Sequence, residues 1–339
     1  EKHCFRFVCV SRPNGCWRVR FDAPNFGPDR RPCVVGSEFF HRAASQVSRF
    51  GLILNPTSGK GKGAVLGPAF ADELSKLGVE LLDLTGASFD EAMENGRRAI
   101  AEGSIDALAV AGGDGMMHLG INLCAGTHVP LALMPCGTGN DAAMTLGIPI
   151  DRPVEAARLA VQALAEPVVV DLGLGVTSNR RFYFFNSASA GFDAIVNRRA
   201  NRWKYPKGPS RYTLAMLYEL MTFESLKYRA KIAGKFRDLD GMLCAVANGP
   251  SYGGGMLVAP NASVTDGLLD LFIVHKISKP ELIKVFPKVF TGEHVSHPAV
   301  EIIRCQDVTL LSEGVPVYAD GEPVGMLPMT VSIAPKSLK

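Results

Sequence analysis

Between residues 49 and 166, short and continuously apolar runs alternate with segments of helical periodicity. The apolar runs are RFGLILNP (49–56), VELLDLT (79–85), IDALAVAGG (105–113) and PLALMPCG (130–137). Strands that are apolar along their whole length are typical of a parallel sheet with helices on both faces. The pattern therefore predicts an N-terminal doubly wound, Rossmann-like α/β domain over residues 48–166.

The segments between these runs carry helix signals. Ser88 and Glu91 form a capping box that predicts a helix to about Ala101. The other helices are expected after the turn at 57–63, at 115–126, from 137 to 147 and at 152–166.

The pattern changes after residue 166, where strand-like runs follow one another between turn residues. These runs lie at 167–176, 181–192, 226–234, 241–250, 256–260, 268–277, 301–311 and 329–335. Helices are expected only at about 209–223 and at 279–290, where Ser278 and Glu281 form a second capping box. The series predicts a mainly antiparallel β-sandwich domain over residues 167–324, with residues 325–339 packing back on the first domain.

Composition narrows the class of protein. The 339 residues carry a net charge of +3, which is too small to indicate nucleic acid binding. No apolar run reaches the length of about 18 residues that predicts a membrane-spanning helix. Cys124, Cys136, Cys244 and Cys305 lie in apolar segments, as reduced thiols of intracellular proteins do. We therefore expect a cytoplasmic protein, and we expect residues 1–47 to form a poorly ordered basic extension.

Three glycine-rich turns follow predicted parallel strands. They are NPTSGKGKG (55–63), GGDG (112–115) and PCGTGND (135–141). The carboxyl ends of parallel strands share one sheet edge, where ligands bind, and helix N-termini at that edge favour anions. Lys60 and Lys62 add positive charge. The sequence thus predicts a phosphate site built from backbone amides, although it contains neither a Walker loop nor G-x-G-x-x-G.

Asp114, in the middle turn, changes this picture. An acid beside a triphosphate is repelled unless a divalent cation or a network of donors lies between them. Asp114 therefore favours a Mg²⁺–nucleotide over a bare phosphate. Asp141 is a second acid nearby, but an acid is also typical of the first turn of a helix.

These three motifs, in this order and spacing, resemble the diacylglycerol kinase catalytic domain of the superfamily that includes sphingosine and ceramide kinases. The stretches VANGPSYGGGMLVAPNASVTDGLLDLFIV (246–274) and YADGEPV (318–324) are similar to the second domain of its soluble bacterial members. The resemblance covers residues 49–339. It implies an ATP-dependent kinase that phosphorylates the hydroxyl of a membrane lipid, with diacylglycerol, which becomes phosphatidic acid, as the expected acceptor.

The resemblance also implies roles for particular residues, with ATP and Mg²⁺ as cofactors. The implied ATP-binding residues are Asn55, Pro56, Thr57, Ser58, Gly59, Thr85, Gly112, Gly113, Asp114, Gly115, Met116, Met117, His118 and Thr138. Glu322 and Asp114 would be catalytic, with Glu322 taking the proton from the lipid hydroxyl. A structural Mg²⁺ would be held by the Asp266 carboxylate and the carbonyls of Ser263 and Leu268. Taken without the resemblance, TDG and YADGEPV are typical of structural turns.

Two positions depart from the family pattern. The family usually has threonine after GGDG and asparagine two residues later, where this chain has Met116 and His118. Met116 lacks a hydroxyl that could contact phosphate, but sphingosine and ceramide kinases resemble this chain in using apolar residues there. A sphingoid or ceramide acceptor is therefore an alternative. His118 is also typical of the surface of a helix.

Residues 197–212, NRRANRWKYPKGPSRY, interleave basic and aromatic side chains. Such a segment suits an anionic bilayer interface, although a solvated loop is an alternative. We expect peripheral membrane association, a lipid substrate and no nucleic acid partner, and we leave a homodimer open. A NAD kinase, which shares the GGDG turn, and a catalytically silent binding protein are rival functions. The GTGND and DGE motifs favour a lipid kinase, and the joint presence of Asp114, Asp266 and Glu322 favours an active enzyme.

Overall fold

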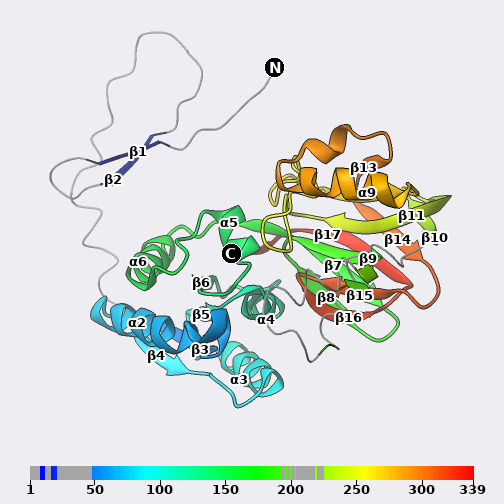
Figure 1. Ribbon diagram of the computed structural model, residues 1–339. Helices are drawn as coiled ribbons and strands as arrows, with labels where there is room; N and C mark the ends of the chain where they lie inside the picture. The colour runs from blue at the N-terminus through cyan, green and yellow to red at the C-terminus, as the bar shows by residue number, and fades with distance from the viewer. Residues whose placement is uncertain are drawn as a thin grey trace, which may run out of the picture. The chain divides into compact units, whose positions relative to one another are not determined.

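The structure is a computed structural model that describes residues 8–11, 17–20, 48–191, 195–196, 199, 203, 218–219 and 225–339 (Figure 1). The chain divides into two units, Glu1–Gln46 and Val47–Lys339. In the first unit, strands β1 (Val8–Ser11) and β2 (Trp17–Arg20) pair in antiparallel fashion. The predictions for the rest of residues 1–47, for the 197–212 segment and for a helix at 209–223 fall almost wholly outside the described residues.

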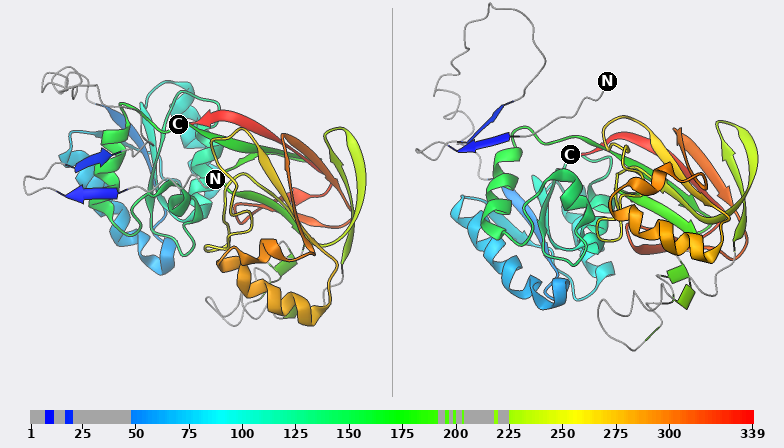
Figure 2. Two further views of the ribbon diagram at one scale, coloured as in Figure 1. Left: turned by 90° about the horizontal axis from the view of Figure 1, so that it is seen from above. Right: turned by 45° about the horizontal axis from the view of Figure 1, so that its top comes forward.

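The first half of the second unit contains a parallel sheet covered by helices on both faces (Figures 1 and 2). Its four strands, in spatial order, are β4 (Glu80–Asp83), β3 (Arg49–Leu54), β5 (Ala107–Gly112) and β6 (Leu131–Pro135). Its helices are α1 (Ser58–Gly61), α2 (Gly63–Lys76), α3 (Phe89–Ala101), α4 (Asp114–Cys124), α5 (Asp141–Leu146) and α6 (Pro153–Ala163). The α/β prediction is confirmed.

Hydrophobic packing explains why β5 is buried along its whole length. Residues of β3 and β5 that face one side pack with α2 and α6 around Phe70 and Leu74. Those that face the other side pack with α3 and α4 around Met93 and Leu119. Helices therefore cover both faces of these strands, which explains why the strands are apolar along their whole length.

The second half is mostly antiparallel. Its strands are β7 (Val170–Thr177), β8 (Arg181–Phe184), β9 (Ser187–Gly191), β10 (Leu226–Ile232), β11 (Lys235–Ala247), β12 (Leu269–His275), β13 (Val300–Cys305), β14 (Asp307–Leu311), β15 (Pro316–Ala319), β16 (Glu322–Met326) and β17 (Met329–Leu338). Over the described residues, the order is β16-β15-β9-β11-β10-β14-β17-β7-β8, and β12 joins β11 to β13. The helical elements α9 (Lys279–Val285), η2 (Phe286–Phe290) and η3 (Glu293–Ser296) cover part of this sheet. The prediction of a mainly antiparallel second part is confirmed.

Four local predictions are wrong in this half. The runs at 181–192 and 301–311 each form two strands instead of one. Residues 256–260 do not form a strand, since only an isolated bridge joins Tyr252 to Met256 across three glycines with positive φ. The helix expected at 279–290 ends at Val285 and continues as the 3₁₀ helix η2. Pro287 accounts for the change, because its nitrogen has no hydrogen to donate to a helical bond.

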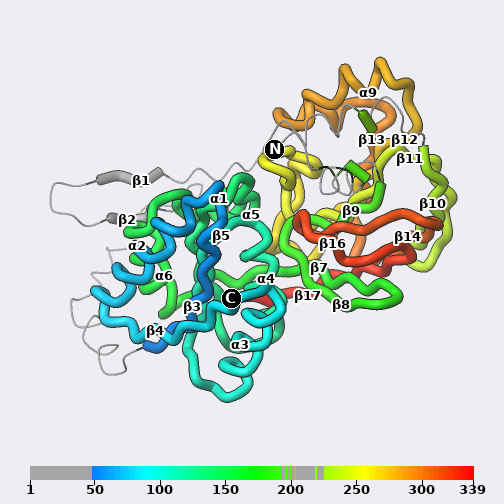
Figure 3. The backbone as a smooth tube through the Cα atoms, turned by 60° about the horizontal axis from the view of Figure 1, so that its bottom comes forward, coloured from blue at the N-terminus to red at the C-terminus, as the bar shows by residue number. Residues whose placement is uncertain are grey.

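The C-terminal strand reaches the α/β half. The carbonyl of Ser337 accepts a hydrogen bond from Gly126 N, and that of Lys339 accepts one from Leu131 N. Helix α4 also lies against β8, which brings the two halves together along the side of this helix (Figure 3). None of the helices that the structure describes is long and apolar enough to cross a membrane.

Candidate active site

The three glycine-rich turns predicted to share one sheet edge lie in contact. A Cβ placed on Gly113 would be 2.9 Å from the Cα of Gly137, which is too close for any side chain. A Cβ on Gly59, whose φ is +58°, would overlap the carbonyl oxygen of Cys136. The turns therefore meet backbone to backbone, and only glycine permits this approach.

The turn after β3 is held by hydrogen bonds to side chains. Asn55 Oδ1 accepts from Thr57 N at 3.0 Å and from Thr57 Oγ1 at 2.8 Å. Thr85 Oγ1, from the end of β4, accepts from Leu54 N at 3.0 Å. Ser58 and its glycine neighbour form the first turn of α1. The structure thus places these predicted nucleotide residues around the end of one strand, with Pro56 and Thr138 exposed on their turns.

Asp114 begins α4, but its carboxylate binds the start of another helix. Its Oδ2 accepts from Asn140 N at 2.8 Å, and its Oδ1 accepts from Asp141 N at 2.7 Å. Burial raises the pKa of Asp114 from its ordinary value of 3.8 to about 6, and the charge of Asp141 adds to the shift. The two amide bonds oppose this shift. The sequence predicts either a divalent cation or a network of donors beside Asp114. The backbone amides of the GTGND turn supply such a network.

Asp141 connects the two halves of the unit. Its buried carboxylate accepts hydrogen bonds of 2.7 Å from Gly254 N and Gly255 N, which belong to the glycine loop after β11. Burial raises the pKa of this carboxyl, while the amide bonds lower it. The sequence left open whether Asp141 is a second acid of the nucleotide site or a helix acid, and it did not predict this contact, because the partner loop is more than a hundred residues away.

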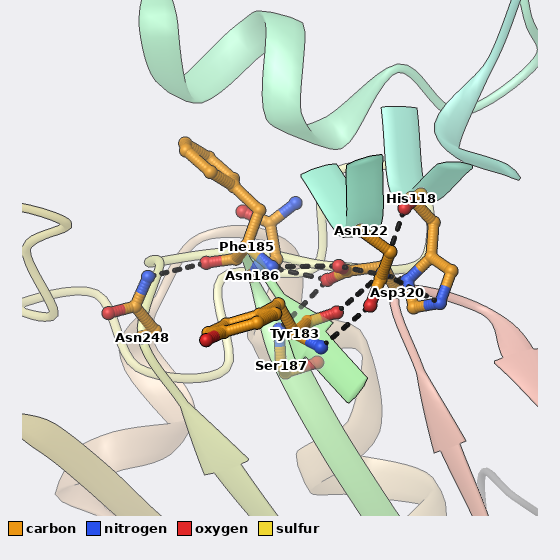
Figure 4. Close-up of polar contacts among 8 residues, drawn as sticks. All are labelled: His118, Asn122, Tyr183, Phe185, Asn186, Ser187, Asn248 and Asp320. Atoms are coloured by element: carbon orange, nitrogen blue, oxygen red, sulfur yellow. Dashed lines mark hydrogen bonds and ion pairs between the residues drawn. The ribbon is translucent and has the colours of Figure 1, made fainter. Parts of the chain in front are cut away.

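Asp320 organises the turn between β8 and β9 (Figure 4). Its carboxylate accepts from Phe185 N and Asn186 N at 2.8 Å each and from Ser187 N at 3.2 Å. The Nδ1 atom of His118 lies 3.7 Å from Asp320 Oδ2. Because Asp320 lies in the turn between β15 and β16, two residues before Glu322, these contacts fix the turn of the hairpin that carries Glu322.

His118 is only 1% exposed, so the interpretation as a helix-surface histidine is wrong. Its Nε2 lies 3.3 Å from Asn122 Nδ2, one turn further along α4. Met116 and Met117, which precede it, are also buried. Residues 116–118 of α4 are therefore enclosed, because the second half of the unit packs over them.

Two asparagines that sequence reasoning missed hold this packing in place (Figure 4). Asn122 Oδ1 accepts from Tyr183 N at 2.9 Å, and Asn122 Nδ2 donates to Tyr183 O at 3.0 Å. Asn248 Nδ2 donates to Phe185 O at 2.7 Å and to Asp171 O at 3.1 Å. The sequence offered one signal of this role, since each asparagine stands inside an apolar run. Burial of a carboxamide costs free energy unless the group is hydrogen-bonded.

Glu322 lies over the first turn of α4. A Cβ added to Gly115 would stand 2.6 Å from Glu322 Oε1. Position 115 must therefore be glycine, because a side chain there would overlap this carboxylate. The structure brings Glu322, from the C-terminal hairpin, to the glycine turn that contains Asp114, although the two residues are far apart in sequence.

The predicted metal loop has a different environment. Asp266 pairs with the guanidinium of Arg304, and its Oδ1 accepts from Leu268 N at 3.1 Å. Arg304 also lies 3.5 Å from Asp270, and the hydroxyl of Ser263 contacts that of Thr265 at 3.1 Å. No cluster of three or more His, Cys, Asp or Glu is found in the parts of the chain that the structure describes. The one carboxylate fits Mg²⁺ if carbonyls and water complete the shell, but the metal would share it with Arg304.

An apolar cavity of about 70 Å³ lies in the second half. Its lining includes Met242, Tyr252, Met256, Phe272, Leu282 and Val289. His294 also lines it, and burial lowers the pKa of this imidazole. Tyr252 and Met256 flank the glycines that bind Asp141, so one loop joins the cavity to the glycine turns.

Comparison with known proteins assigns both halves. Residues 49–172 match the diacylglycerol kinase catalytic domain, and residues 186–339 match the YegS C-terminal NAD kinase beta sandwich-like domain. The diacylglycerol kinase of Mycobacterium tuberculosis (strain ATCC 25618 / H37Rv) is 36% identical over 87% of this chain and 95% of its own length. A protein named "Probable lipid kinase YegS-like", from Chromohalobacter salexigens, is 32% identical over 67% of this chain and 72% of its own.

The solved structures agree on the fold. The crystal structure of a diacylglycerol kinase from Bacillus anthracis strain Sterne superposes with a TM-score of 0.64 at 20% identity, over 87% of this chain and 96% of that one. The two-domain architecture and the matched relatives define a lipid kinase. The chain belongs to the diacylglycerol kinase catalytic-domain family.

Proposed function

We propose that the protein transfers the γ-phosphoryl group of ATP to the hydroxyl of a membrane lipid, with Mg²⁺ as cofactor and diacylglycerol as acceptor. The observation that carries this proposal is the contact of the Glu322 carboxylate with Gly115, at the point where three glycine turns meet. A proton acceptor and a set of backbone amides thus lie side by side, as phosphoryl transfer to an alcohol requires.

The residues divide the work in the following way. The amides of the turns after β3, β5 and β6 that do not already bind Asn55, Asp114 or Asn140 bind the phosphates, together with Ser58 and Thr138, because helix N-termini attract anions. Asp114 holds the N-terminus of α5 in place through its two amide bonds. Mg²⁺, when bound, neutralises phosphate charge. Glu322 accepts the proton of the acceptor hydroxyl at its carboxylate, which is a general-base role.

Asp266, with the carbonyls of Ser263 and Leu268, is the candidate for a second, structural Mg²⁺. The loop is fixed from behind, since Gly267 N donates to Asp171 Oδ2 at 2.8 Å. A cation there would replace Arg304 as the partner of the Asp266 carboxylate.

The apolar cavity supports a lipid acceptor over a soluble one. Its lining is almost wholly hydrocarbon, which is unsuited to the ribose and phosphates of NAD, and its volume of about 70 Å³ admits only a short part of an acyl chain. The loop of Tyr252 and Met256 would then connect the acyl site to the glycine turns. Phosphorylation of a bilayer lipid also requires peripheral association with a membrane.

The test is an acceptor panel. The protein is incubated with Mg²⁺, ATP labelled in its γ-phosphoryl group, and separate micelles of diacylglycerol, sphingosine or ceramide, with NAD in a further reaction. We expect label in phosphatidic acid, and at least about a hundredfold less with the Glu322→Gln variant. Label in NADP, or none in any lipid, would contradict the proposal, whereas label only in a sphingoid base or ceramide would change the acceptor.

A further inference from the structure

The segment from α9 to η3, residues 279–296, presents apolar side chains to solvent. Ile283 is 54% exposed, Phe290 is 52% exposed and Val295 is 40% exposed. The segment, drawn in orange, lies on the outside of the second half in both views of Figure 2. Large apolar side chains that gather on one short surface segment mark an interaction site more often than single ones do.

The same segment carries positive charge. Lys279, Lys284 and Lys288 are exposed on it. Of its two acidic residues, Glu281 lies 3.2 Å from His297, and Glu293 is exposed. Lysines beside exposed apolar residues are the composition of a surface that lies in the interface of an anionic bilayer.

The buried side of the segment faces the apolar cavity. Leu282, Phe286 and Val289 form one wall of that cavity. These residues alternate with exposed ones along the segment. A single layer of helix therefore separates the exposed apolar surface from the cavity. A bilayer on the outer side would bring the acyl chains of a lipid next to the cavity.

A second surface of the protein offers a comparison. Phe236, on the hairpin of β10 and β11, is 54% exposed, and Lys227, Lys231 and Lys235 are exposed near it. The guanidinium of Arg229 lies 4.6 Å from the centre of its ring. A ring that is already covered by a cation is less available to hydrocarbon than the side chains of residues 279–296.

We propose that residues 279–296 form the surface by which the protein docks on an anionic bilayer. Ile283, Phe290 and Val295 enter the boundary between headgroups and acyl chains, and Lys279, Lys284 and Lys288 lie at the lipid phosphates. The identification of a lipid bilayer as the partner of this surface rests on the proposed function. It assigns docking to a different segment from residues 197–212.

The test measures vesicle binding by sedimentation, without ATP, on equimolar phosphatidylglycerol and phosphatidylcholine and on phosphatidylcholine alone. The Ile283→Ser/Phe290→Ser variant should lose about tenfold or more in partition coefficient on anionic vesicles. Its matched control, Phe236→Ser, should bind as the parent does. Replacing Lys279, Lys284 and Lys288 by glutamine should cost about fivefold per charge on anionic vesicles, with little effect on neutral ones. Glutamine at Lys227, Lys231 and Lys235 is the charge control.

Equal binding by the parent and the Ser variant, or a loss confined to the hairpin controls, would overturn the proposal. Sedimentation equilibrium without lipid tests the other occupant, because a lower mass for the Ser variant would show that this face joins two copies of the chain. Turnover on short-chain diacylglycerol in detergent is measured separately. A Ser variant that retains this turnover but loses vesicle binding supports docking, whereas an inactive parent that binds vesicles would contradict the proposed function alone.

Discussion

The same dipeptide, Asp-Gly, stands in two regions of this molecule with opposite surroundings. At the centre, Asp114 and Asp320 are enclosed, and both carboxylates accept only backbone amides in the hydrogen bonds described above. At the metal loop, Asp266 pairs with the side chain of Arg304 near the surface. The sequence signals are alike, but the hydrogen bonds of the first region come from main-chain amides alone, whereas Asp266 has one amide, from Leu268, and the side chain of Arg304.

The difference shows what burial demands of a carboxylate. A buried charge is costly unless several donors surround it, and backbone amides are donors whose positions are fixed by the fold. Asp114, Asp141 and Asp320 therefore determine where loops lie. An exposed carboxylate paired with a long side chain can exchange its partner, so the proposed cation at Asp266 would compete only with Arg304 and not with a loop.

The largest effect is expected for Glu322, the one acid of the central region whose carboxylate faces the glycine turn without holding a loop. Glu322→Gln keeps size and polarity but removes the proton acceptor, so kcat should fall by about 10²- to 10⁴-fold. ATP affinity, measured by equilibrium binding, should stay within a few-fold. Glu313→Gln, at an exposed position, is the control, and a collapse of ATP affinity with normal kcat would assign Glu322 to nucleotide binding.

The next largest effect is expected for Asp320, whose loss leaves three amides without an acceptor. Asp320→Ala should lower the free energy of unfolding by about 2–4 kcal/mol, measured by denaturant titration, because unsatisfied buried donors are costly. Asp320→Asn retains one acceptor oxygen and should lose less. Asp307→Ala is the exposed control. An alanine variant as stable as the parent would show that water replaces the carboxylate and that the contrast with Asp266 fails.

The pH dependence of stability tests Asp114. Its folded pKa of about 6 lies above its ordinary value of 3.8, so the folded state binds the proton more tightly than the unfolded state does. The contribution of this carboxyl is therefore present at low pH and lost as pH rises through about 6. Relative to Asp114→Asn, which does not titrate, the parent should be about 1–2 kcal/mol more stable at pH 5 than at pH 7.5. A difference that does not change with pH would mean that the amide bonds fully offset burial.

The last prediction concerns the predicted metal loop. Arg304→Gln removes the pair with Asp266 and also the cation beside the buried carboxylate of Asp270, so the free energy of unfolding should fall by about 1–2 kcal/mol. It should, however, strengthen Mg²⁺ binding, because a competing cation is gone, whereas Asp266→Ala should abolish it. Calorimetric titration with Mg²⁺ measures both. If no variant responds to Mg²⁺ and the parent does not bind it, the loop is a turn stabilised by Arg304.

Local sequence signals determined most of the fold and part of the site. The four parallel strands, the capping box at Ser88 and the three glycine turns follow from periodicity and residue type, which act over a few residues. The shared edge of the turns also followed, because parallel strands end on the same side. The failures were local as well: three glycines prevented a strand before residue 260, and Pro287 ended a helix early.

What only the tertiary structure decided is the set of partners that lie far apart in the sequence. Asp320 lies 135 residues from Phe185, and Asp141 lies 113 residues from Gly254. No periodicity relates such positions, since the first contact depends on the pairing of β15 with β9 and the second on the packing of the loop after β11 against α5. The packing of α4 against the second half buried His118 and placed Glu322 over Gly115. The sequence by itself determined which groups could do chemistry, whereas burial and long-range packing decided which of them hold the backbone and which one lies over the glycine turn.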